Sequence, residues 1–177
     1  LDLQTMTEKF LYDGMVSVRG KAAGAVVMDP ESGEILAMAT VPGFNPNQYG
    51  KYSAAQRKLS ILTDPFEPGS VFKILTVAAA LENGVATPES KYFCHNGSMN
   101  VGKNVVTEAA GHKYQWLTVN DIFKFSSNIG TTKIAMDLGY TRLNKFLKKL
   151  NVGEATGIEL RGESKGIYQE QKKPSLI

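Results

Sequence analysis

In the N-terminal part of the chain, one helical pattern of apolar positions is followed by two stretches typical of β-strands. Apolar residues recur at helical spacing between Leu3 and Leu11, which predicts an amphipathic helix that runs to about Val18. Two stretches rich in β-branched and small apolar residues then predict strands over residues 25–29 and 34–40. The Pro, Ser and Gly residues between them are typical of a turn, so these strands should form a hairpin.

The most apolar helical pattern follows a loop. Residues 74–81 are apolar on nearly every face of a helix, which is typical of a central, buried helix. Pro68 and Gly69 are turn residues, so the chain should change from loop to helix near Ser70. Asn83-Gly84 provides a C-terminal stop signal for this helix.

The second half of the chain is mainly helical in pattern. Thr118, with an acidic first turn at Asp121, predicts the start of a short apolar helix. A second helix is predicted from about Ile129 to Leu138, stopped by Gly139, and a third reaches Leu150. Strands at one end and helices after them indicate an α+β protein. Weaker patterns predict a helical stretch over 54–62, short strands near Tyr92 and Val105, and a loop with one short strand over 151–177.

Candidate chemistry lies at the start of the central helix. Ser70 and Lys73 are three residues apart, so on a helix they lie on one face, one turn above each other. Serine is a poor nucleophile without a base, and lysine acts as a base when burial lowers its pKa. The backbone N–H of Ser70, at the positive end of the helix dipole, is also placed to stabilise an oxyanion.

The Ser-x-x-Lys spacing is common by chance, and serine at a helix start is a frequent N-cap. A second motif adds weight, because Ser126, Ser127 and Asn128 lie in the break between two predicted helices. Polar side chains in such a break can point into a cleft, although a second helix cap explains them too. Residues 98–100 also read Ser-x-Asn, but the pattern there indicates a surface loop and not a site.

Composition excludes several other classes. The formal charge is +3 and the lysines are spread along the chain, which argues against nucleic-acid binding. No run of about eighteen apolar residues predicts a membrane span, and no signal peptide is evident. Cys94 is the single cysteine, so no internal disulfide forms, and Cys94-His95 has no partners at metal-ligand spacing. No metal or cofactor is predicted.

With these motifs together, the chain resembles the transpeptidase domain of penicillin-binding proteins, a family known for its Ser-x-x-Lys, Ser-x-Asn-type and Lys-Thr-Gly motifs. The resemblance rests on Glu67–Lys73 and Ser126–Asn128, and it extends over nearly the whole chain. The Ser-Ser-Asn and Glu-Pro-Gly-Ser forms are most similar to class B enzymes of the division type. Further matching segments are the hairpin at residues 25–39, residues 63–64, residues 156–158 and residues 162–168.

The resemblance implies an α+β fold of the β-lactamase and transpeptidase type. The hairpin would be part of a five-stranded antiparallel sheet, and the helices would form a helical subdomain. The implied segments are 1–62 (helix, hairpin and lead-in), 63–150 (helical subdomain with the active serine) and 151–177 (connecting segment). No Lys-Thr-Gly occurs in the chain, so it resembles the N-terminal part of such a domain. We expect the missing strands to come from a second chain or from the remainder of the protein.

The activity that the resemblance implies is D,D-transpeptidation of peptidoglycan stem peptides ending in D-Ala-D-Ala, in cell-wall synthesis at division. Ser70 would be the nucleophile, Lys73 its base, Ser126 a proton relay and Asn128 a ligand of the substrate amide. β-Lactams would acylate Ser70, and division proteins are expected partners. An N-terminal membrane anchor outside this chain would hold the domain outside the cytoplasm. A serine β-lactamase or β-lactam sensor, and a non-catalytic division scaffold, are the alternatives.

Overall fold

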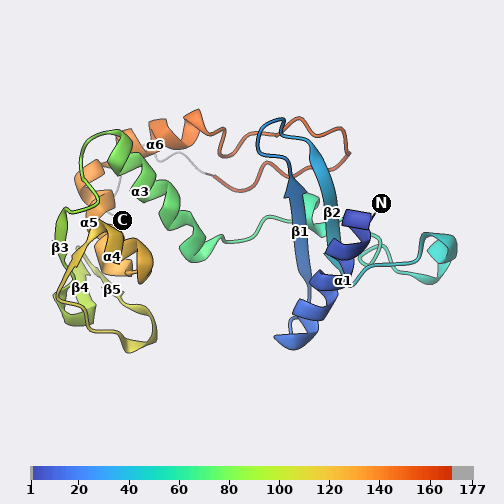
Figure 1. Cartoon of the computed structure of the whole chain (residues 1–177), viewed down its shortest axis with the longest axis horizontal. Coiled ribbons are helices and arrows are strands. Elements are labelled where there is room, and N and C mark those ends of the chain that lie inside the picture. Colours follow the sequence, from blue (N-terminus) through green and yellow to red (C-terminus); the bar gives the residue numbers. More distant parts are fainter. Residues whose placement is uncertain (1, 169–177) are drawn as a thin grey trace. The chain divides into compact units, whose positions relative to one another are not determined.

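A computed structural model describes residues 2–168 of the chain. The chain divides into two compact units, which we describe separately. Of the described residues, the first unit comprises 2–65 and 157–166, and the second comprises 66–156 and 167–168. Figure 1 shows both units and labels elements in each of them. No described helix is both long and apolar enough to cross a bilayer.

The first unit is a helix packed on a hairpin. Helix α1 (Asp2–Ser17) contacts strands β1 (Ala23–Met28) and β2 (Ile35–Val41), which pair antiparallel from Ala23↔Val41 to Met28↔Ile35. Alternate residues of β2 are buried, as expected of a strand with one face against a helix. These elements confirm the predicted N-terminal helix and hairpin.

The side chain of Gln4 links α1 to the backbone of β2. Its Nε2 donates to the carbonyl of Met38, and its Oε1 accepts from the Met38 N–H, both at 2.9 Å. The amide therefore bonds to Met38 through one donor and one acceptor, as a neighbouring strand would. This contact fixes the position of α1 on the hairpin.

The connection between the hairpin and the second unit is less helical than we predicted. It contains the 3₁₀ segment Pro46–Lys51 and the short helix α2 (Ser60–Thr63), so the helix predicted over 54–62 is largely wrong. Ser53 and Gln56 bond to each other's backbone and side chains and close a single turn instead. One closed turn has little tendency to extend, because helix nucleation is costly without a packed apolar face.

The second unit is built around helix α3 (Lys73–Glu82), which contacts α4 (Val119–Lys124), α5 (Asn128–Leu138) and α6 (Tyr140–Lys149). The helices confirm the predicted starts and stops: Thr118 and Asp121 form a capping box on α4, and Gly139 ends α5. Figure 1 shows α3, α5 and α6 in this unit.

Two small antiparallel ladders complete the second unit. Strand β3 (Lys91–Phe93) pairs with β6 (Trp116–Thr118), and β4 (Ser98–Val101) pairs with β5 (Asn104–Thr107). The surface loop predicted at residues 98–100 is therefore wrong, since Met99 and Val101 alternate into the core. A strand of four residues with only two apolar positions gives too weak a pattern to distinguish it from a loop. Within the described part of 151–177, no strand is present.

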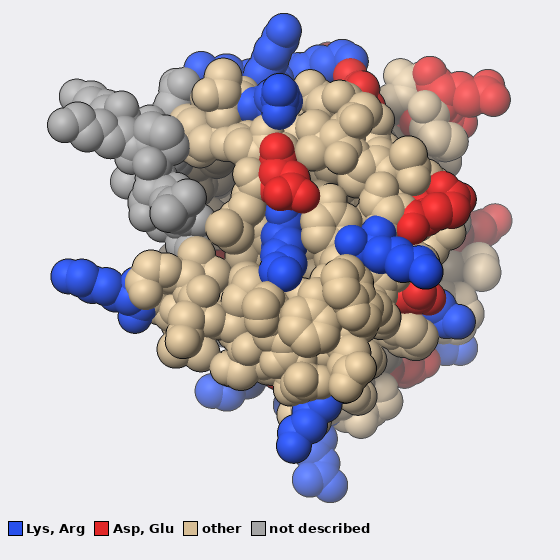
Figure 2. Space-filling view, turned by 90° about the vertical axis from the view of Figure 1, so that its left-hand side faces the viewer, with Lys and Arg blue, Asp and Glu red and all other residues tan. Residues whose placement is uncertain are grey.

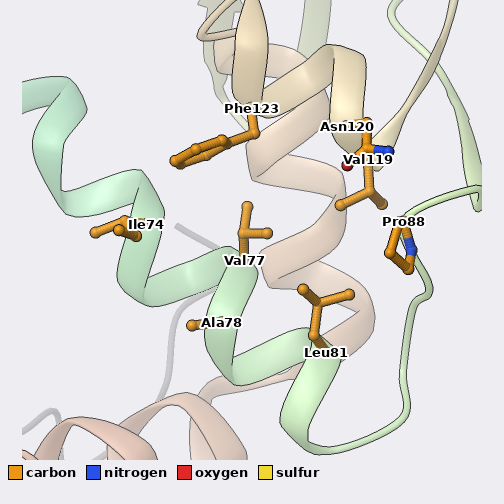
Figure 3. A pocket seen from close by; sticks show the side chains of 8 residues that line it. All are labelled: Ile74, Val77, Ala78, Leu81, Pro88, Val119, Asn120 and Phe123. Carbon is orange, nitrogen blue, oxygen red and sulfur yellow. The ribbon is translucent and has the colours of Figure 1, made fainter.

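Helix α3 is buried on one side only, contrary to the prediction from its apolar sequence. Val77 and Ala80 lie in the main core, but Ile74 is 51% exposed. Its open side forms one wall of an apolar groove of about 260 Å³, with Phe123 and Val119 of α4 opposite (Figure 3). No described residue covers this groove, which explains why apolar residues on that face of α3 are solvent-accessible here.

Candidate active site

Ser70 lies where a loop becomes a helix, as the sequence predicted. It belongs to the 3₁₀ turn Gly69–Phe72, which leads directly into α3. Gly69 has a φ of +57°, a conformation that glycine adopts without strain and that lets the turn begin. Ser70 is exposed, and its carbonyl accepts from the backbone N–H of Lys73 one turn later. The nucleophile candidate is thus accessible at the start of a core helix.

Lys73 is the centre of a polar cluster. Its Nζ donates to the carbonyl of Ser126 at 2.5 Å, to Ser126 Oγ at 3.0 Å and to Asn128 Oδ1 at 2.6 Å. These three acceptors match the three donors of an ammonium group. Its bonding partners within the described residues do not include the Ser70 hydroxyl. The structure therefore brings three of the four predicted site residues into direct contact and places Ser70 one helical turn away.

Burial lowers the pKa of Lys73 from its ordinary value, because the partly buried amine loses hydration that favours its charged form. The negative charge of Glu108 acts in the opposite direction and raises this pKa. Burial is the larger of the two effects. The lysine is thus shifted towards the neutral form that a general base requires.

The break between α4 and α5 presents Ser126 to the lysine. Ser126 has a φ of +55°, in the left-handed region that serine seldom adopts, and it follows the end of α4. Ser127 then caps α5, since its Oγ accepts from the Gly130 N–H at 2.9 Å. Both interpretations of this motif hold: the second serine is a helix cap, and the first faces Lys73.

Asn128 is the first residue of α5, and both ends of its side-chain amide are bonded. Its Oδ1 accepts from Lys73, and its Nδ2 donates to the carbonyl of Thr107 at 2.8 Å. Because the two partners differ in kind, the amide has one orientation that satisfies both. Asn128 therefore connects Lys73 to the end of β5.

Glu108 is a functional candidate that the sequence analysis missed. It is only 7% exposed, and its carboxylate accepts from Ser127 Oγ and from the backbone N–H groups of Asn128 and Ile129. It lies about twenty residues before the motif that it contacts, and no helical or strand spacing relates the two. A single acidic residue in a segment without clear helical or strand periodicity does not indicate a functional site from the sequence alone.

A wide, open cleft of about 470 Å³ adjoins the cluster. It is lined by Lys73 and Asn128 together with residues 105–107 of β5 and Thr131, Thr132 and Ala135 of α5. The cleft thus has a polar end at Lys73 and Asn128 and a partly apolar side from Val105 and Val106.

Other reactive groups do not form sites in the described structure. Cys94 is fully buried in the core, and burial raises the pKa of its thiol, so this thiol is not an activated nucleophile. No group of three or more His, Cys, Asp and Glu residues that could hold a metal is found in residues 2–168. On the face shown in Figure 2, basic and acidic side chains are interspersed, in line with the spread of lysines in the sequence.

The order of these motifs and their geometry agree with the comparison to protein families. The family model of the penicillin-binding protein transpeptidase domain matches residues 23–176. The chain belongs to this family. The predicted family and the α+β fold are therefore confirmed, and the transpeptidase domain accounts for the hairpin, the serine turn and the Ser-Ser-Asn break.

Relatives and solved structures support this assignment. Residues of this transpeptidase domain are 38% identical to the penicillin-binding protein PbpB of Mycolicibacterium smegmatis over 83% of the chain. They are 29% identical to the peptidoglycan D,D-transpeptidase FtsI of Escherichia coli over 99% of the chain. The chain spans 23% and 29% of those two proteins, respectively.

The fold is similar to that of a penicillin-binding protein 3 from Mycobacterium tuberculosis crystallised with ampicillin. The TM-score is 0.87 at 32% identity, covering 96% of this chain and 37% of that one. The transpeptidase domain described here therefore corresponds to less than half of the solved chain.

Proposed function

We propose that the protein containing this chain is a peptidoglycan D,D-transpeptidase that works through an acyl-serine intermediate. The observation that carries the proposal is the position of Lys73, bonded to Ser126 and Asn128 and one helical turn from an exposed Ser70. The relatives named as D,D-transpeptidases and the family match support the same reaction. The substrates are stem peptides ending in D-Ala-D-Ala.

The proposed first step is acylation. Neutral Lys73 accepts the proton of Ser70, whose Oγ forms a bond to the carbonyl carbon of the D-Ala-D-Ala peptide. The bond to the terminal D-alanine nitrogen then breaks, and that nitrogen takes up a proton relayed from Lys73 through Ser126 Oγ, 3.0 Å from Nζ. In the second step, an amine of a neighbouring stem forms a bond to the ester carbonyl carbon and gives up a proton to neutral Lys73. The bond between that carbon and Ser70 Oγ then breaks, and Lys73 returns the proton to Ser70 Oγ, which leaves the crosslinking amide and the serine hydroxyl.

Asn128 has a positioning and binding role in this proposal. Its side-chain amide lies beside the cleft and is held by Lys73 and Thr107, so it can hydrogen-bond a substrate amide in one orientation. A β-lactam presents a similar carbonyl and amide, and its opened ring stays attached to Ser70. The ampicillin complex of the M. tuberculosis relative supports β-lactam binding here.

The proposal extends to the cellular setting of the protein. From the resemblance of its motifs to division-type class B enzymes, we propose that the domain lies outside the cytoplasm, is held by an N-terminal membrane anchor outside this chain and has division proteins as partners. The relatives named as a penicillin-binding protein and a peptidoglycan D,D-transpeptidase support the penicillin-binding and transpeptidase part of this proposal. The segments 1–62, 63–150 and 151–177 are proposed as the lead-in, the helical subdomain and the connecting segment of this domain.

Labelling with a fluorescent penicillin tests the proposal on the complete polypeptide. Wild-type protein should become covalently labelled, Ser70→Ala should not, and Ser98→Ala, in β4 outside the cluster, should label as wild type. Persistent labelling with slow release supports a transpeptidase. Rapid turnover of a chromogenic cephalosporin would instead indicate a β-lactamase, and wild-type protein that never labels would indicate a non-catalytic scaffold.

A further inference from the structure

Glu108 is a buried carboxylate that contacts the catalytic motif from a distant part of the sequence. We infer that Glu108 is a positioning residue that holds Asn128, and through it Lys73, in the geometry needed for acylation of Ser70. The inference rests on the proposed function. It assigns to Glu108 no contact with substrate.

The contacts of Glu108 converge on the start of α5. Its Oε2 accepts from the Asn128 N–H at 2.7 Å, while Oε1 accepts from Ser127 Oγ at 2.5 Å and from the Ile129 N–H at 3.4 Å. Both carboxylate oxygens are therefore occupied by donors from the first turn of one helix. A buried anion there is favoured by the helix dipole and by these bonds, which offset its lost hydration.

The same strand end holds Asn128 at a second point. Thr107, the residue before Glu108, accepts from Asn128 Nδ2 through its carbonyl, and Glu108 binds the Asn128 backbone. Two consecutive residues thus fix both the main chain and the side chain of Asn128. The Glu108 N–H in turn donates to the carbonyl of Gly97, which ties this point to the β4–β5 hairpin.

This anchoring determines where Asn128 Oδ1 can be. That oxygen accepts from Lys73 Nζ at 2.6 Å, so a shift of α5 moves an acceptor of the catalytic amine. A carboxylate is required because the Ser127 hydroxyl and the N–H groups of Asn128 and Ile129 all donate to Glu108, and both of its oxygens must accept. Glutamine has the same shape but replaces one oxygen by an NH₂ donor, which would face a donor of α5. Aspartate retains the charge but is shorter by one methylene.

The test compares Glu108→Gln with a matched helix-cap variant in the complete polypeptide. Asp121→Asn removes the carboxylate of the α4 capping box, which bonds Thr118 and contacts none of the catalytic cluster. Each variant loses a carboxylate at the start of a helix: Glu108→Gln at α5, and Asp121→Asn at α4. We expect both to lower the melting temperature, but only Glu108→Gln to slow penicillin acylation, by about tenfold or more, since small misplacements of catalytic groups have large effects on rate.

A mutant cycle with Asn128→Ala separates positioning from general destabilisation. If Glu108 acts through Asn128, adding Glu108→Gln to Asn128→Ala should change the acylation rate little, whereas Asp121→Asn should have the same effect in either background. Additive effects of Glu108→Gln, or a wild-type acylation rate in that single variant, overturn the inference. If Glu108→Gln does not fold, Glu108→Asp takes its place, and a wild-type rate in Glu108→Asp likewise overturns it.

The proposed function and this inference fail in different ways. Wild-type protein that is not acylated refutes the function. Wild-type protein that is acylated at Ser70, with Glu108→Gln equally fast, refutes only the positioning role.

Discussion

Lys73 joins two of the other predicted site residues through a single amine. Its amine bonds to both predicted partners, Ser126 and Asn128, and its pKa reflects a balance between burial and the charge of Glu108. The pH at which the acylation rate rises should therefore change when the burial of this amine or the charge near it changes.

We predict that Glu108→Gln moves the rising limb of the acylation rate to lower pH. Acylation needs neutral Lys73, so the rate rises as pH passes through its pKa. The charge of Glu108 favours the protonated amine, so removing it lowers the pKa. Stopped-flow acylation between about pH 6 and pH 10 measures this shift. Asp121→Asn serves as the control, and its acylation rate should rise at the same pH as in the wild type. If the rate of Glu108→Gln rises at the wild-type pH or at a higher pH, the prediction is contradicted.

The positions of single site residues were predictable where they depend on local spacing. Ser70 and Lys73 are close because a helix brings positions three apart onto one face, and the break at Ser126 followed from two helix boundaries. Glu108 was not predictable, because its contact with α5 depends on how the β4–β5 hairpin packs. No pattern within a window of the sequence encodes that packing.

Helices α4 and α5 pack closely against each other beside the site. Gly130 lies on the first turn of α5, and a Cβ there would be 2.5 Å from Cγ1 of Ile122 in α4. Because glycine has no side chain, the first turn of α5 can pack against Ile122 of α4, directly after the break that contains Ser126. The Gly of the Ser-Ser-Asn-Ile-Gly sequence is thus explained by packing.

Gly130→Ala should destabilise the protein by about 1–3 kcal/mol, because the added methyl overpacks a buried contact. Gly14→Ala in α1 is the matched control: no atom lies within 4 Å of the place that its added methyl would take, and alanine there should stabilise by about 0.5–1 kcal/mol. Urea unfolding of the complete domain measures both changes. Equal effects of the two substitutions would contradict the role of close packing.

Helices and strands were predictable from the sequence where their pattern of apolar residues was long or where capping residues marked their ends. Helices α1, α3, α4 and α5 and the β1–β2 hairpin all have clear periodicity or capping residues. The short strands β4 and β6 were missed, since three or four residues carry too little alternation to distinguish a strand from a loop. The exposed side of α3 was also missed, because an apolar sequence does not indicate which of its faces is covered.

At the scale of the whole molecule, the sequence contains the proposed catalytic residues of two motifs, Ser70 and Lys73 of one and Ser126 and Asn128 of the other, and no Lys-Thr-Gly. The proposed transpeptidase needs a further anchor for the substrate carboxylate and a second oxyanion donor. We expect these outside the 177 residues, in line with relatives that are more than twice as long.

The isolated 177-residue chain should therefore show little or no transpeptidase activity or penicillin labelling, while the complete polypeptide labels at Ser70. Mass spectrometry and size-exclusion chromatography of the isolated chain provide the second measurement. We expect association with another chain, because a two-stranded hairpin with an unpaired edge is marginal alone. A stable 19.3 kDa monomer that labels rapidly would contradict both expectations.

The bonds between Gln4 and Met38 determine at which edge of the hairpin a further strand can pair. Since both backbone groups of Met38 point to Gln4, its cross-strand neighbour Val26 directs its own N–H and C=O away from β2. One side of the sheet is thus blocked by a side chain at its middle, and the other presents backbone groups. A further strand can add beside β1 but not beside β2, so a single glutamine makes the sheet extend one way only.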